Sequence, residues 1–197
     1  MSLDYELRID STWDSVELLS FLKESLNFQQ EESEKNLWIP GIWLRSSRET
    51  EKNQTMMHSW FGFKPTLIVA FVLNSIHDYE IGKATLLKTV VRLLQEIPGD
   101  AVLLFNYESL VLQRIAGELI FNQTLQTWPK SEISAVTSQF HLAPLRSPLL
   151  TDDSPQVEID QKTYPLLTSV AIGQGKSIKE LATEAIDAYL QQAVAEK

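Results

Sequence analysis

The residue types that most often carry enzyme chemistry are sparse in this chain of 197 residues. There is no cysteine, which excludes disulfides, thiolate metal ligands and thiol nucleophiles. The three histidines, His58, His77 and His141, lie far apart, and none has a partner at a metal-ligand spacing. No serine occupies the strand-to-helix elbow that exposes a hydrolase nucleophile. We therefore expect no catalytic residue, no metal site and no cofactor, and a protein that is not an enzyme.

The glycine-rich segment 173–177 (GQGKS) resembles a phosphate-binding loop at first sight. A P-loop has four residues between its first glycine and the Gly-Lys-Ser triplet, and it follows a strand. Here one residue separates the two glycines, and the preceding residues have a helical pattern. The segment therefore predicts a turn between two helices and no nucleotide site.

The composition is that of a globular protein, with 44% hydrophobic and 22% charged residues. The net charge is −9 and the isoelectric point is about 4.8. Nucleic-acid binding needs lysine and arginine to neutralise phosphates, so this charge disfavours it; a basic protein partner fits, as does solubility alone. No apolar run approaches the roughly 20 residues that span a bilayer, and the N-terminus lacks a signal-peptide pattern. We expect a cytoplasmic protein without a membrane segment.

Two apolar strands and the helix between them form the predicted centre of the fold. Residues 66–73 and 101–105 are the most apolar runs, and residues 81–97 place apolar side chains at helical spacing. Residues 3–9 alternate as in a half-buried strand, with Asp4, Glu6 and Arg8 on the polar side.

The remaining elements are predicted to extend this unit. Residues 13–27 form a helix that begins at the hydroxyls of residues 11–12 and carries the apolar stripe Trp13, Val16, Leu19, Leu22 and Leu26. Residues 36–45 form an aromatic strand that Pro40-Gly41 interrupts, as a bulge or a tight turn would. Residues 46–55 form a polar exposed loop, and residues 110–121 form one strand with a bulge at Gly117. Residues 123–150 contain three prolines and predict an irregular wrap with one helical turn near Ile133.

The predicted order, β-α-β-β-α-β-β, indicates an α+β protein with a ferredoxin-like βαββαβ core and one added strand. Two helices would cover one face of an antiparallel sheet, and the other face would be left to a partner or to the linker. We divide the chain into an α+β domain (1–125), a proline-containing linker (126–154) and a C-terminal module (155–197).

Several short motifs in the first domain match one bacterial family. They are Phe61-Gly62-Phe63, Pro65-Thr66, Gly82, Leu86-Leu87, Pro98-Gly99-Asp100, residues 101–106, Glu108 and Gly117-Glu118-Leu119. Over residues 1–122 the chain resembles the immunity proteins that protect bacteria against swarming-inhibition (Sit-type) toxins. It departs from that pattern in the turn at 74–76 and at Tyr107, where the family has glycine. The resemblance implies a protein that binds and blocks a toxin domain without catalysis.

The C-terminal module has a different pattern. Residues 156–160 alternate as a short strand, a helix follows up to residue 172, and Ser177 with Glu180 forms a capping box for a second helix. This resembles the ribbon-helix-helix module of bacterial repressors and antitoxins, which implies that two chains pair their strands in a homodimer. The dimer-interface candidates are Val157, Ile159, Leu167, Val170, Ile178, Leu181, Ile186 and Tyr189.

In ribbon-helix-helix proteins the outer face of the strand reads DNA in the major groove. Here that face is Gln156, Glu158 and Asp160, and its two acids would repel phosphates. From residue 151 onward, four lysines stand against eight acidic residues, a net charge of −4. We expect a homodimer and do not expect nucleic-acid binding.

Tryptophan and arginine are the side chains most enriched in binding hot spots. The candidates for contact with a protein partner are Trp38, Trp43, Arg45, Arg48 and Trp60. Trp38 and Trp43 are an odd number of positions apart, so in one regular strand they would face opposite sides unless Pro40-Gly41 shifts the register.

The sequence supports a non-catalytic, protein-binding function, and the family resemblance implies toxin neutralisation. The alternative is a DNA-binding transcriptional regulator or antitoxin that acts through its ribbon-helix-helix segment. A third alternative, an enzyme on the ferredoxin-like scaffold, has no acid–base pair or nucleophile to support it.

Overall fold

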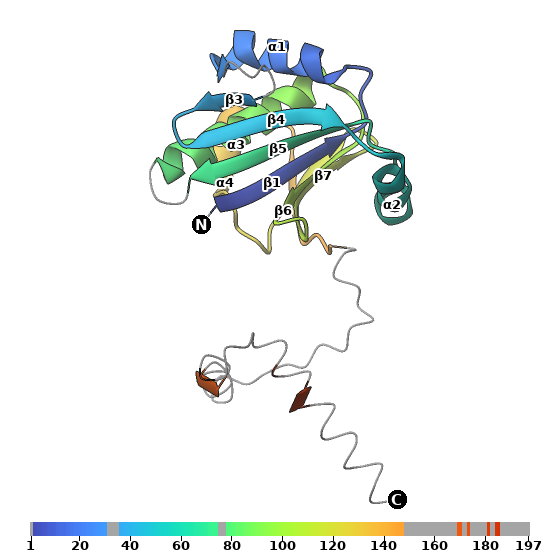
Figure 1. Cartoon of the computed structure of the whole chain (residues 1–197), viewed down its shortest axis with the longest axis vertical. Helices are drawn as coiled ribbons and strands as arrows, with labels where there is room; N and C mark the ends of the chain where they lie inside the picture. The colour runs from blue at the N-terminus through green and yellow to red at the C-terminus, as the bar shows by residue number, and fades with distance from the viewer. Residues whose placement is uncertain are drawn as a thin grey trace, which may run out of the picture. The chain divides into compact units, whose positions relative to one another are not determined.

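The structure is a computed structural model that describes residues 2–30, 36–74 and 78–147, together with the isolated positions 169, 170, 173, 181, 184 and 185. The chain divides into two compact units, Met1–Thr151 and Asp152–Lys197. The sheet and the labelled helices all belong to the first unit (Figure 1). The domain limits at residues 125 and 154 stay a prediction.

The described part of the first unit holds a nine-stranded sheet in the order β2-β3-β4-β5-β1-β6-β7-β8-β9. Its strands are β1 (Ser2–Ile9), β2 (Gln29–Gln30), β3 (Asn36–Ile39), β4 (Ile42–Arg48), β5 (Leu67–Asn74), β6 (Ala101–Phe105), β7 (Ser109–Ile115), β8 (Glu118–Asn122) and β9 (His141–Ala143). Its helices are α1 (Ser15–Leu26), α2 (Glu51–Phe61), α3 (Tyr79–Glu96) and α4 (Lys130–Val136). Neighbouring strands pair antiparallel, apart from the parallel pair β8 and β9.

The four central strands follow the expected topology. β1 lies between β5 and β6, and β4 lies on the other side of β5, so each βαβ connection crosses one intervening antiparallel strand. The architecture is α+β, as expected, and this strand order agrees with a ferredoxin-like core. One added strand was predicted, whereas the sheet has β2 and β3 beyond one edge of the core and β7, β8 and β9 beyond the other.

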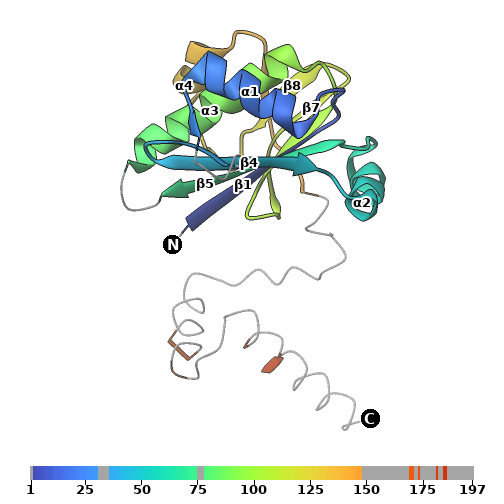
Figure 2. The same ribbon diagram turned by 45° about the horizontal axis from the view of Figure 1, so that its top comes forward.

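Helices α1, α3 and α4 lie together on one side of the sheet (Figure 2). The main core fills the space between them and the sheet. Along β1, the side chains of Tyr5, Leu7 and Ile9 are buried on this side, as the alternating pattern predicts. We call this side of the sheet the covered face.

Helix α1 begins at Ser15, two residues later than the sequence suggests. Asp14 is its N-cap: the carboxylate accepts hydrogen bonds from the backbone N–H groups of Val16 and Glu17, at 2.8 and 2.9 Å. Glu17 in turn accepts from the backbone N–H of Asp14, which completes a capping box. The predicted start at the hydroxyls of residues 11–12 is therefore wrong. Val16 also leaves the predicted apolar stripe, since it is 71% exposed.

Two predicted strands are hairpins. The chain reverses at Pro40-Gly41, between β3 and β4, and again at Ala116-Gly117, between β7 and β8. Gly41, Ala116 and Gly117 all have left-handed backbone, with φ of +86°, +52° and +82°. Such residues close tight hairpin turns, and the sequence alone did not separate this role from a bulge inside one strand.

The prediction of a loop over residues 46–55 is also wrong, although most of these residues are exposed, as expected. β4 continues to Arg48, and α2 follows after Thr50, whose hydroxyl caps the helix by accepting from the Asn53 N–H. Gly62, in left-handed backbone, ends the helix. Met57 is the only residue of α2 that is fully buried, so the apolar periodicity is too weak to stand out in the sequence.

Part of the stretch predicted as a linker has regular structure. The turn expected near Ile133 is α4, and Ile133 is buried. Trp128 is buried beside it, with its ring edge-on to Phe121 at 6.2 Å and its indole N–H donated to the Lys83 carbonyl at 3.2 Å. β9 then pairs with β8 at the edge of the sheet.

Close backbone contacts explain two of the glycine motifs. A Cβ on Gly82 would overlap the carbonyl oxygen of Gly41, where the β3–β4 turn meets the start of α3. A Cβ on Gly99 would overlap the carbonyl oxygen of Asp10. These motif positions therefore serve the packing of turns against the ends of other elements.

Arg114 of β7 fixes the end of α3. Its guanidinium donates hydrogen bonds to the carbonyl oxygens of Leu94 in the last turn of α3, of its C-cap Ile97, and of Gly99 in the turn that follows. Burial lowers the pKa of Arg114, and the nearby Asp100 partly offsets that shift.

Candidate protein-binding face

The side of the sheet opposite α1, α3 and α4 carries the polar residues of β1 and the aromatic residues of the β3–β4 hairpin. Cross-strand pairing sets these side chains in rows. One row is Gln29, Trp38, Trp43, Val72 and Asp4. The next row is Asn36, Arg45, Ala70, Glu6 and Leu104.

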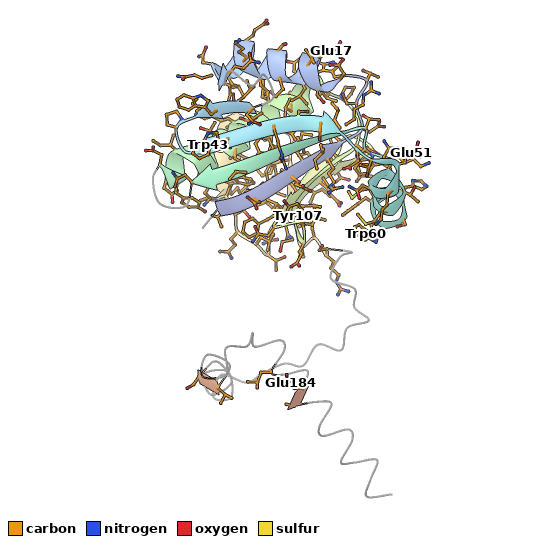
Figure 3. All side chains as sticks on the ribbon, in the orientation of Figure 1. Glu17, Trp43, Glu51, Trp60, Tyr107 and Glu184 are labelled. Atoms are coloured by element: carbon orange, nitrogen blue, oxygen red, sulfur yellow. The ribbon has the colours of Figure 1, made fainter. Side chains whose placement is uncertain are left out.

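Helix α2 covers one end of this side, so the expectation that the whole face stays free is wrong. Met57 of α2 and Phe63 pack on Val102, Leu104 and Leu110 in a second, smaller core. Figure 3 shows α2, with Trp60, at one end of the sheet and Trp43 towards the other. We call the uncovered part, formed by β3, β4, β5 and β1, the open face.

A buried ion-pair network marks the boundary between the open face and α2. Arg8 donates to Glu49 through Nη1 (2.7 Å) and to Glu6 through Nη2 (2.8 Å), and all three residues are less than a tenth exposed. Glu49 also accepts from the Thr50 backbone N–H (3.0 Å) and the Asn53 side chain (2.8 Å), which ties β1 to the first turn of α2. The network places two carboxylates against one cation.

Next to this network the open face is hollowed. The hollow has a volume of about 410 Å³, and its lining includes Asp4, Glu6, Trp43, Arg45, Ala70, Val72 and Tyr107. Ala70 lies in its row between Arg45 and Glu6, so a methyl group stands where both neighbours have long side chains. The hollow therefore follows from one small residue within a row of large ones.

Tyr107 lines the hollow from the β6–β7 turn, in a backbone conformation that few side chains adopt. Its φ is +66°, and that of Asn106 is +48°. The Asn106 N–H donates to the Asp4 carbonyl at 2.8 Å, and the Ser147 hydroxyl donates to the Glu108 carbonyl. The turn is thus held from both sides, and it presents a ring that is 54% exposed (Figure 3).

Three of the five predicted partner-binding residues share the open face. Trp38 and Trp43 are direct cross-strand partners, so they face the same side, and Arg45 follows in the next row. In one regular strand the two tryptophans would face opposite sides, but the chain reverses at Pro40-Gly41 between them, so the interruption expected at these residues decides their relation. Trp43 is 43% exposed and Trp38 is half-buried.

The other two candidates lie elsewhere. Arg48 pairs with Leu67, whose side chain is in the main core, so Arg48 is on the covered side at the end of β4, where it is exposed. Trp60 is half-buried on α2 against the second core. Binding by any of the five residues stays a prediction.

Most residues of the predicted dimer interface lie outside the described part of the chain: Val157, Ile159, Leu167, Ile178, Ile186 and Tyr189. The predicted DNA-reading residues Gln156, Glu158 and Asp160 also lie outside it. Val170 and Leu181 are described, both in helical backbone, and Val170 is 46% exposed while Leu181 is half-buried.

Tyr5 lies between Asp4 and Glu6 on β1, with its ring on the covered side, 4.9 Å from the ring of Phe105. Burial, and to a smaller extent the proximity of Tyr79, raises the pKa of Tyr5 to about 12. The hydroxyl therefore stays protonated at all ordinary pH values.

Within residues 2–30, 36–74 and 78–147, no three side chains of His, Asp or Glu come close enough together to hold a metal ion. The helices in the same ranges include none that combines the length and apolarity needed to cross a bilayer.

The hollow contains residues that the sequence did not single out for binding. Asp4 and Glu6 belong to the polar side of their strand in the sequence pattern, but acidic side chains, unlike tryptophan and arginine, are not enriched in binding hot spots. Tyr107 appeared only as a departure from a glycine position. An aromatic side chain at a turn position suited to glycine was the signal available for it.

Comparison with protein families adds a finding that does not depend on this geometry. The family model described as SitI3-like matches residues 3–132, a range that includes the open face, α2 and Tyr107. No curated protein and no solved structure matches the chain.

Proposed function

Because the chain belongs to the SitI3-like family, we propose that it is an immunity-type protein that binds a bacterial toxin domain in the cytoplasm and neutralises it without catalysis. The observation that carries this proposal is the family match over residues 3–132. The partner it implies is a protein, and a protein partner needs an exposed surface with anchoring side chains.

The open face is the best candidate for that surface. Trp43 and Val72 are neighbours in one row and are 43% and 36% exposed, so they offer adjacent apolar side chains to a partner. Polar residues surround them in the same and the next row, including Asp4, Asn36 and Arg45. An apolar centre with a polar rim is the usual organisation of a protein interface.

Co-expression with the toxin encoded by the neighbouring gene tests the proposal. Cells should survive with the wild-type protein and die without it. Trp43→Ala should reduce protection, because it removes the largest exposed apolar side chain of the open face. Val16→Ala is the matched control, since Val16 is 71% exposed on α1, on the other side of the sheet.

The outcomes distinguish whether the protein has the immunity function from whether the open face is its binding surface. If cells die equally with and without the wild-type protein, the immunity function is wrong. If the wild-type protein protects and Trp43→Ala protects equally well, the role stands and the open face is not the binding surface.

We further infer that residues 155–197 form a homodimer through the ribbon-helix-helix pairing that their sequence pattern suggests. Each particle would then carry two copies of the toxin-binding surface. Light scattering should give a dimer for the full chain and a monomer for a chain truncated after residue 150. A monomeric full chain would contradict this part of the proposal.

A further inference from the structure

The hollow on the open face joins two carboxylates and two aromatic rings in one place. Asp4 and Glu6 come from alternate positions of β1 and therefore point to the same side. Trp43 and Tyr107 line the same hollow from β4 and from the β6–β7 turn.

The carboxylate of Glu6 is only partly satisfied. Its Oε2 accepts from Arg8 at 2.8 Å, and its Oε1 has no hydrogen-bond partner among the described residues, although Glu6 is more than nine-tenths buried. Glu6 also lines the hollow. Oε1 is not one of the fully buried atoms that lack a hydrogen bond, so it is open to the hollow, where a cation that enters can replace water and pair with the carboxylate. Asp4 adds a second carboxylate that has no side-chain partner in the described part of the chain.

The two aromatic rings also favour a cationic side chain. A guanidinium or ammonium group is attracted to the face of tryptophan and tyrosine, and a nearby carboxylate strengthens the binding. Tyr107 occupies left-handed backbone, which disfavours residues with a Cβ, and yet its ring is half-exposed and buries little. Packing of the ring in the core therefore does not explain why a tyrosine occupies this strained position.

We propose that the hollow is the docking point for an arginine or lysine side chain of a protein partner. The basic group would lie between the rings of Trp43 and Tyr107 and would pair with Asp4 and Glu6. The identity of that partner rests on the proposed function, which makes it the toxin domain.

Charge favours this occupant over the alternatives. The chain carries a net charge of −9, so a basic surface on the partner is complementary to it. The chain's own segment from residue 151 onward has a net charge of −4, which makes it a poor guest for two carboxylates. Arg45 lies two strands away from Glu6, about 10 Å across the sheet, so it directs the incoming cation to the acidic side of the hollow.

The direct test titrates the isotope-labelled full chain with N-acetyl-arginine amide and follows the indole N–H signals by nuclear magnetic resonance. The chain has five tryptophans, and Trp43→Phe identifies the signal of Trp43. We expect a saturable shift of that signal with the arginine probe. The neutral analogue N-acetyl-citrulline amide should bind about five-fold more weakly or not at all. Added salt should weaken the arginine shift.

Two variants test the residues. Asp4→Asn keeps the shape of the side chain and should weaken arginine binding about five-fold, whereas a Glu6 variant would also break the Arg8 network. Tyr107→Asn removes the ring but places a residue that tolerates left-handed backbone. It should weaken binding while the thermal midpoint stays equal to, or above, that of the wild type. A residue kept only for the fold would lower the midpoint.

Three results would overturn the proposal. One is the absence of a Trp43 shift, which would also follow if the C-terminal segment occupied the hollow. Another is an equal shift with arginine and citrulline. The third is a Trp43 signal that moves with protein concentration alone, because a second copy of the chain would then be the occupant.

The co-expression assay separates this proposal from the function on which it rests. If the wild type protects but Asp4→Asn and Tyr107→Asn protect equally well, the immunity function stands and the hollow is not the docking point. If the wild type fails to protect, the immunity function fails, and the arginine titration still decides whether the hollow binds a cation.

Discussion

Neighbouring residues of the same strand have different environments on the two faces of the sheet. Phe71 of β5 is fully buried on the covered face, and Val72, the next residue, is 36% exposed on the open face. The covered face packs apolar side chains against α1 and α3. The open face presents rows of charged, polar and aromatic residues, with Ala70 as the small residue between Arg45 and Glu6.

Most residues that carry the family resemblance contribute to the main core under the covered face or to the turns and helix ends around it. Gly82 and the segment 98–100 hold turns and helix ends in place, and Leu86 and Leu87 are in the main core. The hollow is built from residues outside those motifs, Asp4, Glu6, Trp43 and Arg45, and from Tyr107, where the chain departs from the motif. If the hollow is the docking point proposed above, fold and recognition are encoded by different residues, and this division can be tested.

The largest effect should come from replacing two neighbouring residues of β5, Phe71 and Val72, by alanine one at a time. Phe71→Ala should lower the free energy of unfolding by about 3–5 kcal/mol, because it leaves a cavity in the main core. Val72→Ala should cost less than about 1 kcal/mol, since that side chain is partly in water already. Urea denaturation measures both. Equal losses would mean that the two faces do not differ in the way described.

The next prediction concerns the buried ion-pair network at the boundary between the open face and α2. Arg8→Met should destabilise the protein by about 3 kcal/mol, because it leaves the buried carboxylates of Glu6 and Glu49 without their cation. Arg45→Met is the matched control on the same face. Arg45 is exposed and has no partner among the described residues, so the control should stay within about 0.5 kcal/mol of the wild type. Equal stability of the two variants would show that the network does not stabilise the fold.

The third prediction uses alkaline pH to probe the covered face alone. Because the pKa of Tyr5 is raised from 10.0 to about 12, the folded protein holds this proton more tightly than the unfolded chain. The resulting stability, about 2–3 kcal/mol, is fully present below pH 10 and is lost as the pH rises through 12. Tyr5→Phe should lose correspondingly less stability over this interval. Identical pH profiles for the two proteins, measured by denaturation at closely spaced pH values, would contradict the burial of the hydroxyl.

The smallest effect tests the contact between the β3–β4 turn and the start of α3. Gly82→Ala should cost about 1–2 kcal/mol, since the overlap with the Gly41 carbonyl outweighs the better helix propensity of alanine. Lys88→Ala, an exposed position on the same helix, should change stability by less than about 0.5 kcal/mol. A stabilised Gly82→Ala protein would mean that the β3–β4 turn moves freely away from α3.

The sequence predicts the covered face well and the open face poorly, for a physical reason. Burial imposes a period of two on β1 and a helical period on α3, and both patterns are visible in the residue types. The open face depends on which strands become neighbours. Counted along one regular strand, Trp38 and Trp43 would face opposite sides, whereas the hairpin turn at Pro40-Gly41 places them together. Tyr107 joins Trp43 through pairing between strands about 60 residues apart, which no local pattern encodes.

Helix α2 was missed for a similar reason. Its apolar residues are few, and its attachment depends on Glu49, which reaches Arg8 across 41 positions of the chain. The hydroxyl of Thr50 and the glycine at 62 were visible as helix ends, but the polar residues between them suggested a loop.

The two outer strands of the described sheet, β2 and β9, have a further consequence. They are two and three residues long, and Pro144 directly follows β9. Such short borders offer few free backbone groups to a strand from another molecule, which limits edge-to-edge aggregation and also limits recognition by strand addition. A partner that binds the described part of the sheet would therefore read side chains, so its specificity would change through surface substitutions without any change in backbone pairing.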